Sequence, residues 1–289
     1  MEPAATDCEL AESIGGLDRL LAGPRRRGSR IGFVPTLGGL HGGHRSLIET
    51  ARRGSDVVVV SVFLNPTQFE DPRDLARYPA DLAADRAFAT RAGADVVFAP
   101  SVEEVYPGGP GIVTVDPGVL GSVFEGAARP GHFRGVATVV TKLLAIVSPS
   151  VAYFGEKDYQ QLVIVRQLVA DLSLPVEIVA CPTVRDPDGL AVSTRNTFLG
   201  PEERRAATVL HRALRAGEDA VRAGTSDAHA VEAVMRATAE AEPAVALDYA
   251  SVVADGRLEP LSSVAGDVAL LIAARVGAVR LIDHLRVAR

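Results

Sequence analysis

Short runs of apolar, β-branched residues alternate with helix-like patterns through the first two-thirds of this 289-residue chain. The run DVVVVSVFL at 56–64 is almost continuously apolar, which is typical of a strand buried on both faces of a sheet. Alternation of this kind favours right-handed βαβ crossovers and a parallel sheet covered on both sides. The pattern predicts strands at 31–35, 56–64, 95–99, 151–154 and 176–180, and helices at 43–53, 80–92, 135–147 and 158–172.

The predicted order of helices and strands changes after about Pro182. From there, two helices rich in Ala and Arg precede three more strands. We therefore expect an α/β fold with a Rossmann-like parallel-sheet domain over 1–182 and a smaller C-terminal α+β domain over 183–289. The later helices are expected at 201–223 and 226–241, and the later strands at 247–253, 267–274 and 278–285.

Charge and cysteine content narrow the class of protein. Thirty basic and 36 acidic residues give a net charge of −6, which argues against nucleic acid or an anionic membrane as the partner. The two cysteines form no CxxC pair, and the first residues lack the layout of a secretory signal. No apolar run has the length of a membrane span. These features predict a cytoplasmic protein, with Arg25–Arg27 in a solvated loop.

Lysine is rare: Lys142 and Lys157 are the only two among the 30 basic residues. Because the compact ammonium of Lys fits tight pockets that Arg cannot enter, each surviving Lys is a candidate functional residue. Lys157 follows a predicted strand, so it could neutralise phosphate charge; an ion pair with Glu156 or Asp158 is the alternative. Lys142 falls within a predicted helix and is interpreted as structural.

Polar clusters follow the predicted strands where parallel strands end, which is the edge at which such sheets bind ligands. His41 and His44 follow the first strand, and Asn65 and Gln68 the second. Two further clusters lie at 155–161 and 184–196. We expect these four segments to converge on one site.

The stretch PTLGGLHGGH places His41 and His44 on a glycine-rich turn at the start of a helix. Glycines let the backbone approach a ligand closely, and a helix N-terminus attracts anions. Two imidazoles there could donate hydrogen bonds to phosphate oxygens. A zinc pair or structural histidines are the alternatives, although the other four histidines offer no ligand-like spacing.

The remaining polar candidates suit a small substrate and a nucleotide. Asn65, Gln68 and Gln161 could hold a hydroxylated carboxylate by directed hydrogen bonds, or could simply cap loops and helices. Ser193, Thr194 and Arg195 could cradle a second phosphate. Asp85 could help to hold Mg²⁺ bound to phosphates, or could be a solvated helix carboxylate.

An ordered series of motifs resembles the pantothenate synthetase (pantoate–β-alanine ligase) family, within the HxGH nucleotidylyltransferase superfamily. The series comprises PTLGGLHGGH, VSVFLNPTQFE, YPADLAAD, FEGAARPGHFRGVATVVTKLL, FGEKDYQQL, PTVRDPDGLAVSTRN and LDYASVV. The resemblance implies that pantoate attacks ATP with Mg²⁺ to give pantoyl adenylate and pyrophosphate. The β-alanine amine then displaces AMP. It also implies a homodimer and a C-terminal lid over the nucleotide.

The resemblance also implies a role for individual residues. The catalytic residues would be His41, His44, Lys157 and Arg195. The ATP contacts would be Leu37, Gly43, His44, Gly155, Lys157, Asp158, Val184, Val192, Ser193, Thr194 and Arg195. Gln68 and Gln161 would grip pantoate, with Leu37, Phe63, Val139 and Val140 at its gem-dimethyl group. The surrounding wall of the active site would include Asn65, Tyr78, Glu125 and Arg129. Asp85 would be linked to the metal.

Five positions depart from the family pattern. Leu37 stands where Met is usual, Gly42 where Glu is common and Thr194 where Ser is usual. Ala80 and Ala84 replace an Arg and an acidic residue, which weakens the metal assignment of Asp85.

Two other functions would use the same residues. A nucleotidylyltransferase of the HxGH type would make a nucleotide-linked product and stop there. A non-catalytic nucleotide-binding regulator would bind ATP without turnover.

Overall fold

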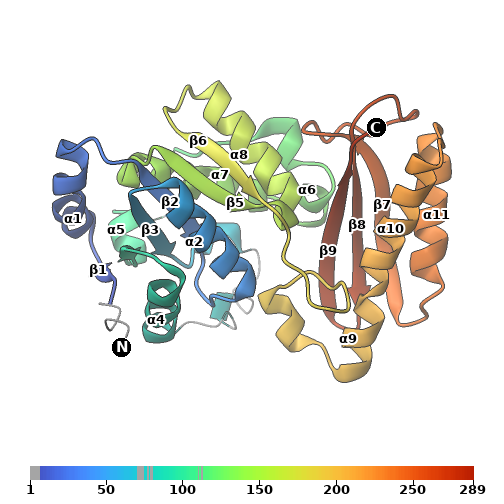
Figure 1. Cartoon of the computed structure of the whole chain (residues 1–289), viewed down its shortest axis with the longest axis horizontal. Coiled ribbons are helices and arrows are strands. Elements are labelled where there is room, and N and C mark those ends of the chain that lie inside the picture. The colour runs from blue at the N-terminus through green and yellow to red at the C-terminus, as the bar shows by residue number, and fades with distance from the viewer. Residues whose placement is uncertain (1–6, 70–74, 77, 79–80, 110, 112) are drawn as a thin grey trace. The chain divides into compact units, whose positions relative to one another are not determined.

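The computed structural model describes residues 7–69, 75–76, 78, 81–109, 111 and 113–289. The chain forms two compact units (Figure 1). The first contains the residues up to Glu156 together with Ile164–Pro182, and the second contains Lys157–Val163 together with Thr183–Arg289. Of the described helices, none is both long and apolar enough to cross a membrane.

The first unit is built on a six-stranded sheet in the order β1-β4-β3-β2-β5-β6, in which every neighbouring pair is parallel. The predicted α/β class with a Rossmann-like parallel sheet is confirmed. The strands are β1 (Glu9–Ala11), β2 (Ile31–Thr36), β3 (Val57–Val62), β4 (Val96–Phe98), β5 (Val151–Gly155) and β6 (Glu177–Cys181).

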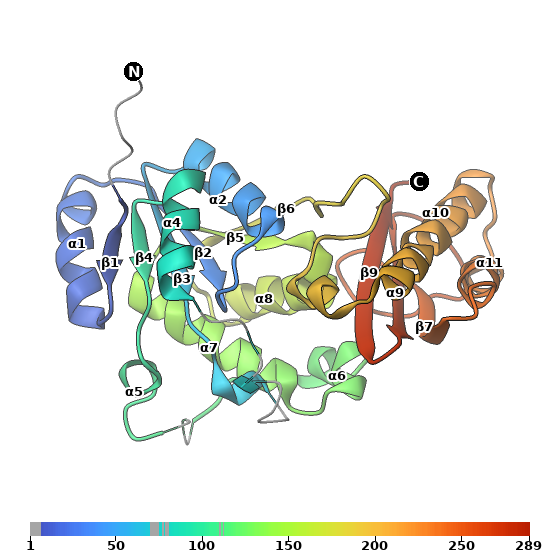
Figure 2. The same ribbon diagram turned by 90° about the horizontal axis from the view of Figure 1, so that it is seen from below.

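Helices cover both faces of this sheet, with α2 and α4 on one face and α7 on the other (Figure 2). Ile48 on α2 and Ala89 on α4 pack on Val34, Val58 and Val60 in one buried cluster. The helices are α1 (Ile14–Arg26), α2 (Gly42–Gly54), α4 (Leu82–Ala92), α5 (Val102–Val105), α6 (Glu125–Ala128), α7 (His132–Val147) and α8 (Tyr159–Asp171). Short 3₁₀ turns are η1 (Pro66–Gln68), η2 (Gly118–Gly121) and η3 (Glu156–Asp158).

The amino-terminal part differs from the sequence-based expectation. Arg25 and Arg26 form the last turn of α1, so the predicted loop there is wrong. Arg25 pairs with Asp18 and donates to the Val147 carbonyl. A cation in the last turn of a helix is stabilised by the helix dipole, and its side chain can bind free carbonyl groups. The helix predicted from residue 80 begins at Leu82, and Ala80 lies outside the described residues.

The second unit is a three-stranded antiparallel sheet, β7-β8-β9, packed against helices (Figure 1). The helix predicted over 201–223 is divided at Thr208, whose hydroxyl donates to the Arg205 carbonyl and competes with helix continuation. The elements are η4 (Thr194–Phe198), α9 (Pro201–Ala207), α10 (Val209–Arg222), α11 (Ala228–Glu240), β7 (Val245–Ala254), β8 (Val268–Val276) and β9 (Val279–Val287).

The strand order of the first unit reverses between β2 and β5. The chain runs from β2 to β3 on one side, and β5 pairs with β2 on the other. In open parallel sheets the ligand crevice lies beyond the carboxyl ends of the strands at this reversal. The segments that follow Thr36 of β2 and Gly155 of β5 are therefore the first places to look for a site.

Replacing Gly135 by Ala is expected to lower the free energy of unfolding by about 1–3 kcal/mol, the usual cost of overpacking. A Cβ at Gly135 would lie 2.3 Å from the Thr67 carbonyl oxygen, so η1 and α7 would have to separate. Urea denaturation measures the effect. Gly15→Ala is the control, because the nearest atom to its Cβ would be 4.0 Å away. Equal midpoints for the two variants would contradict this account.

Candidate functional site

A buried carboxylate fixes the glycine loop after β2, residues 37–41. Gly38 and Gly39 have φ values of 94° and 62°, in the left-handed region that favours glycine. Asp85 on α4 is 5% exposed. Its Oδ2 accepts a hydrogen bond from Gly39 N–H at 3.0 Å, and its Oδ1 accepts one from Leu40 N–H at 2.8 Å. The Asp85 side chain therefore sets the path of the backbone that leads to His41.

His41 and His44 cap the start of α2 reciprocally. His41 Nδ1 accepts from Gly43 N–H at 3.1 Å, and His44 Nδ1 accepts from His41 N–H at 3.2 Å. Their ring centroids are 4.1 Å apart. A backbone N–H can only donate, so each Nδ1 is the unprotonated ring nitrogen and the proton is on Nε2. Both rings thus present Nε2–H, a hydrogen-bond donor.

The glycines of the HGGH segment have different roles. A Cβ on Gly43 would lie 2.9 Å from Cε1 of His41, so the capping imidazole requires glycine there. A Cβ on Gly42 would meet nothing within 4 Å, so this position has room for a larger side chain. The cap therefore depends on Gly43 and not on Gly42.

A buried hydrogen-bond network surrounds η1. Asn65 is 0% and Gln68 8% exposed, and Asn65 Nδ2 donates to Gln68 Oε1 at 3.0 Å. Arg129 Nη2 donates to the Gln68 carbonyl at 3.3 Å, and the same carbonyl lies 2.9 Å from His132 Nδ1. Asn65 does cap η1 through Thr67 N–H, as the alternative interpretation expected. The network also holds the Gln68 side chain in one orientation.

The other candidates of the first unit come from different elements and differ in burial. Tyr78 donates its hydroxyl hydrogen to the Gly38 carbonyl at 3.2 Å. Glu125 is buried at the start of α6. Phe63, Val139 and Val140 are buried apolar residues, and Leu37 is half-buried after β2. Gly155 ends β5.

In the second unit, one pocket is lined by Lys157, Ser193 and Arg195, together with Asn196 and Asp283. The structure therefore brings three of the sequence-predicted phosphate contacts together. Thr194 lies beside them at the start of η4. Val184 and Val192 are joined by a backbone hydrogen bond of 2.9 Å. Gln161 is half-buried on α8.

Lys157 also forms the alternative contact that the sequence suggested. Its Nζ lies 3.4 Å from Oδ1 of Asp158, a side chain that is 51% exposed. A long ion pair with so exposed a partner contributes little stability. The neighbouring Tyr159 is held firmly: its hydroxyl donates to Asp255 Oδ1 at 2.6 Å and accepts from Gly256 N–H at 2.6 Å. Burial, reinforced by Asp255, raises the pKa of Tyr159, so the hydroxyl stays protonated.

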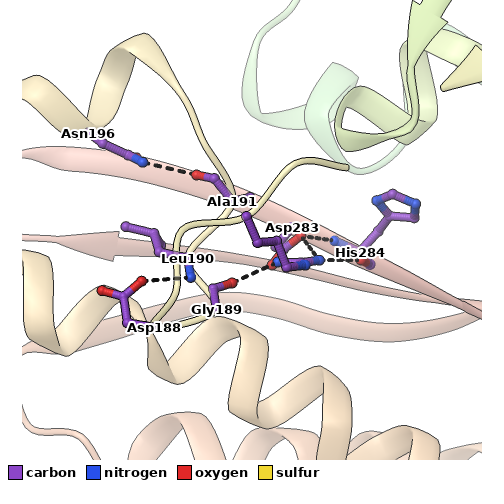
Figure 3. Close-up of polar contacts among 8 residues, drawn as sticks. Asp188, Gly189, Leu190, Ala191, Asn196, Asp283 and His284 are labelled. Atoms are coloured by element: carbon purple, nitrogen blue, oxygen red, sulfur yellow. Dashed lines mark hydrogen bonds and ion pairs between the residues drawn. The ribbon is translucent and has the colours of Figure 1, made fainter. Parts of the chain in front are cut away.

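The loop that carries Ser193 and Arg195 is fastened to β9 by an ion pair between the partly exposed Arg185 and the buried Asp283. Arg185 Nη1 and Nη2 donate to the two carboxylate oxygens of Asp283 at 2.6 and 2.9 Å. The same guanidinium donates to the carbonyls of Gly189 and His284. Figure 3 shows Asp283 and His284 beside the turn Asp188–Ala191, and Asn196 donating to the Ala191 carbonyl.

Sequence reasoning missed Asp283, although a signal was present. Leu281, Asp283 and Leu285 share one face of β9, and Leu281 is buried in the core of the unit. A carboxylate on an apolar strand face is an informative exception to the usual pattern. Reading the alternation of residues 279–287 would have identified it.

Asp85 is buried, so its interpretation as a solvated carboxylate is wrong. Both of its oxygens accept backbone hydrogen bonds. Among the described residues, no group of three or more His, Cys, Asp or Glu is arranged to hold a metal ion. These residues do not form a metal cage, and the metal role of Asp85 stays a prediction.

Taken together, the strand order and the histidine pair at the switch point define a Rossmann-type α/β protein with two histidines at a helix N-terminus. The sequence pattern of the pantoate-beta-alanine ligase family matches residues 9–286, and this chain belongs to that family.

Individual relatives agree with this assignment. A pantothenate synthetase of Moorella thermoacetica is 50% identical over 277 residues, covering 96% of this chain and 98% of that protein. The crystal structure of the Thermus thermophilus pantothenate synthetase has a TM-score of 0.90 and 46% identity, covering 97% of this chain and 100% of that one. A Francisella tularensis pantoate-beta-alanine ligase, solved with beta-gamma ATP and beta-alanine, has a TM-score of 0.79 and 35% identity, covering 96% and 97%.

Asp85→Asn is expected to lower kcat/KM for ATP about 10- to 100-fold, because one charge-assisted hydrogen bond to the glycine loop is lost. If Asp85 acts only as the anchor of the glycine loop, the Mg²⁺ concentration for half-maximal rate should stay unchanged. Asp81→Asn is the control: it removes the same charge from the exposed N-cap of the same helix and keeps the cap. A raised Mg²⁺ requirement in Asp85→Asn alone would instead support the metal role.

Arg185→Lys is expected to lower the free energy of unfolding by about 1.5–3 kcal/mol, because Lys cannot pair with both oxygens of Asp283. The KM for ATP should rise while that for pantoate stays near wild type. Arg222→Lys serves as the control, because the Arg222 side chain is 63% exposed although its partner Glu218 is buried. Thermal unfolding and initial rates measure both quantities, and equal behaviour of the two variants would count against the fastening role.

Proposed function

We propose that this chain condenses pantoate with β-alanine to form pantothenate, with ATP converted to AMP and pyrophosphate through a pantoyl adenylate. The observation that carries the proposal is the reciprocal histidine cap of α2, beyond the carboxyl end of β2. It places two Nε2–H donors and a helix N-terminus at the topological switch point, where a triphosphate is best held. Membership of the family supplies the reaction.

In the first step, a carboxylate oxygen of pantoate attacks the α-phosphorus of ATP. The bond from the α-phosphorus to the bridging oxygen breaks, and pyrophosphate leaves with the electron pair. Attack of an anion on a polyanion requires concentrated positive charge and directed donors. We assign this work to His41 and His44 through Nε2–H, and to Lys157 and Arg195 through their charges.

In the second step, the neutral amine of β-alanine attacks the acyl carbon of the adenylate. The carbon–oxygen bond to phosphate breaks, AMP leaves, and the nitrogen releases a proton to solvent. AMP is a far better leaving group than oxide, which is why the acid must be adenylated first. The enzyme forms no covalent bond to the substrate in either step, so it needs donors and positioning rather than a nucleophile.

The proposed substrate contacts are those that the family resemblance implies. The Gln68 and Gln161 amides would bind the carboxylate and hydroxyls of pantoate, and Phe63, Val139 and Val140 its dimethyl group. The ATP contacts would be Leu37, Gly43, Gly155, Asp158, Val184, Val192, Ser193 and Thr194. Asn65, Tyr78, Glu125 and Arg129 would support these residues.

Mg²⁺ belongs to this proposal as part of the MgATP substrate. Mg²⁺ is commonly held by substrate phosphates with one or two carboxylates rather than by an all-protein cage. The absence of a cage among the described residues fits that mode. We further propose a cytoplasmic homodimer in which a C-terminal lid domain, 183–289, closes over the nucleotide.

The proposal is tested by product release. Purified protein with ATP should release pyrophosphate only when pantoate is present, and AMP only when β-alanine is also added. Pyrophosphate release with a stable nucleotide-linked product, unaffected by β-alanine, would indicate a nucleotidylyltransferase instead. ATP binding without turnover would indicate a regulator.

Lys157→Ala should abolish pantoate-dependent pyrophosphate release, because the ammonium that neutralises the leaving phosphates is lost. The unfolding midpoint should stay near wild type, since the ion pair of Lys157 with Asp158 is long and its partner is exposed. Lys157→Arg, which keeps the charge with a larger head group, tests the need for a compact cation. Near-normal turnover by the Ala variant would refute the role.

A further inference from the structure

Tyr106 is a buried tyrosine whose hydroxyl points into the network around η1. It follows α5 and is 3% exposed. Its hydroxyl donates to Oδ1 of Asn65 at 2.9 Å. Its ring centroid lies 6.2 Å from that of Phe63, and Lys142 Nζ on α7 lies 5.5 Å from the same ring. Tyr106 therefore contacts one predicted pantoate residue directly and reaches a second through Asn65.

The hydrogen bonds of Asn65 fix which end of its amide is oxygen. Oδ1 accepts from Thr67 N–H at 3.3 Å, from the Thr67 hydroxyl at 2.9 Å and from Tyr106. Nδ2 donates to the Gly135 carbonyl at 3.3 Å and to Gln68 Oε1 at 3.0 Å. The Thr67 N–H and the Gly135 carbonyl identify this orientation, and Tyr106 supplies one of the two shorter hydrogen bonds to Oδ1, at 2.9 Å, that hold it.

The orientation of Asn65 in turn decides the orientation of Gln68. Because Asn65 Nδ2 is a donor, the Gln68 atom facing it is the acceptor Oε1, and Nε2 is the end of the amide that can serve a ligand. An amide that presents N–H groups suits an oxygen acceptor, such as the carboxylate or hydroxyl of a small hydroxy acid. A flipped Gln68 would present an oxygen to that anion and repel it.

We propose that Tyr106 is a positioning residue for pantoate, which acts through Asn65 to keep Gln68 Nε2 directed at the substrate. The inference rests on the proposed function, in which Gln68 binds pantoate. In this proposal Tyr106 acts on the substrate only through Asn65 and Gln68. Lys142 takes part by holding the Tyr106 ring with its ammonium.

The environment of Tyr106 suits a fixed donor. Burial raises the pKa of Tyr106, so its hydroxyl keeps its proton over the working pH range. Phe63 and Lys142 hold the ring from separate elements, since Phe63 follows β3 and Lys142 lies on α7. The hydroxyl therefore stays in place while the ring, a large apolar group, is packed as core.

The test begins with Tyr106→Phe, which removes the hydroxyl and keeps the ring. The KM for pantoate should rise about fivefold, as expected for one neutral hydrogen bond. The KM for ATP should change less than twofold. Gln68→Ala measures the contribution of the amide itself, and in that background Tyr106→Phe should cause no further rise.

Tyr153→Phe is the matched control for loss of a buried hydroxyl. Tyr153 is also 3% exposed in the first unit, and its hydroxyl pairs with the Ser55 hydroxyl at 3.2 Å. Ser55 precedes β3, so this contact lies toward the amino ends of the strands. The Tyr153 variant should lose stability to a similar extent and leave the KM for pantoate unchanged.

The outcomes separate the inference from the proposed function. If Gln68→Ala leaves the KM for pantoate unchanged, the pantoate role of Gln68 fails. If Gln68→Ala raises that KM and Tyr106→Phe does not, only the inference fails. Equal rises in the KM for pantoate and for ATP in Tyr106→Phe would assign Tyr106 a general structural role and overturn the proposal.

Lys142 is tested by a pair of variants. Lys142→Met removes the charge over the ring and should raise the KM for pantoate less than Tyr106→Phe does. Lys142→Arg keeps a cation at the ring and should restore the wild-type KM. A Met variant with wild-type KM would remove Lys142 from the proposal and leave Tyr106 as the positioning residue.

Discussion

The first backbone N–H groups of a helix have no partner within the helix and must find one elsewhere. At the start of α2 that partner is an imidazole, because His41 Nδ1 accepts from Gly43 N–H while His44 Nδ1 accepts from His41 N–H. This requirement fixes the tautomer of both rings and thereby makes Nε2 the donor. Protonation of Nδ1 would break the cap, so the donor role and the local fold depend on the same atom. The donor role proposed for His41 and His44 depends on this constraint.

The two units use the same device to hold a functional loop. In the first unit, the buried carboxylate of Asp85 receives two backbone N–H groups of the glycine loop. In the second, the buried carboxylate of Asp283 receives both Nη groups of Arg185, and the same guanidinium binds the Gly189 carbonyl. A buried carboxylate with two charge-assisted hydrogen bonds is a strong and directional anchor. Asp85 lies on a helix and Asp283 on a strand, so each loop is bound to a regular element of the fold.

The sequence was sufficient to predict the parallel sheet, because apolar runs such as 56–64 indicate strands buried on both faces and alternate with helical patterns. It also indicated Ser193, Arg195 and Lys157, which line one pocket. It did not indicate Asp85 as a loop anchor or Tyr106 as a partner of Asn65, since both contacts join residues 41 to 46 positions apart. Contacts of that separation depend on the tertiary fold. From residue type alone, Asp85 could equally be a metal ligand and Tyr106 could equally be a core aromatic residue. Gly43 shows the same limit, because its need for glycine comes from the imidazole packed over it.

Lys157 and Arg185 show that the basic side chains of this arginine-rich chain are held in different ways. Arg185 is committed to structure: its fork matches a carboxylate and two carbonyls, and its side chain is 18% exposed. Lys157 is similarly covered, at 19% exposed, yet its ion pair with Asp158 is long and its partner is solvated. A cation held so loosely can change partner at little cost, which suits the role proposed for Lys157 in neutralising a departing pyrophosphate. Tyr159 next to it is held by two short hydrogen bonds, so the backbone beneath Lys157 stays fixed while its ammonium can turn to a ligand.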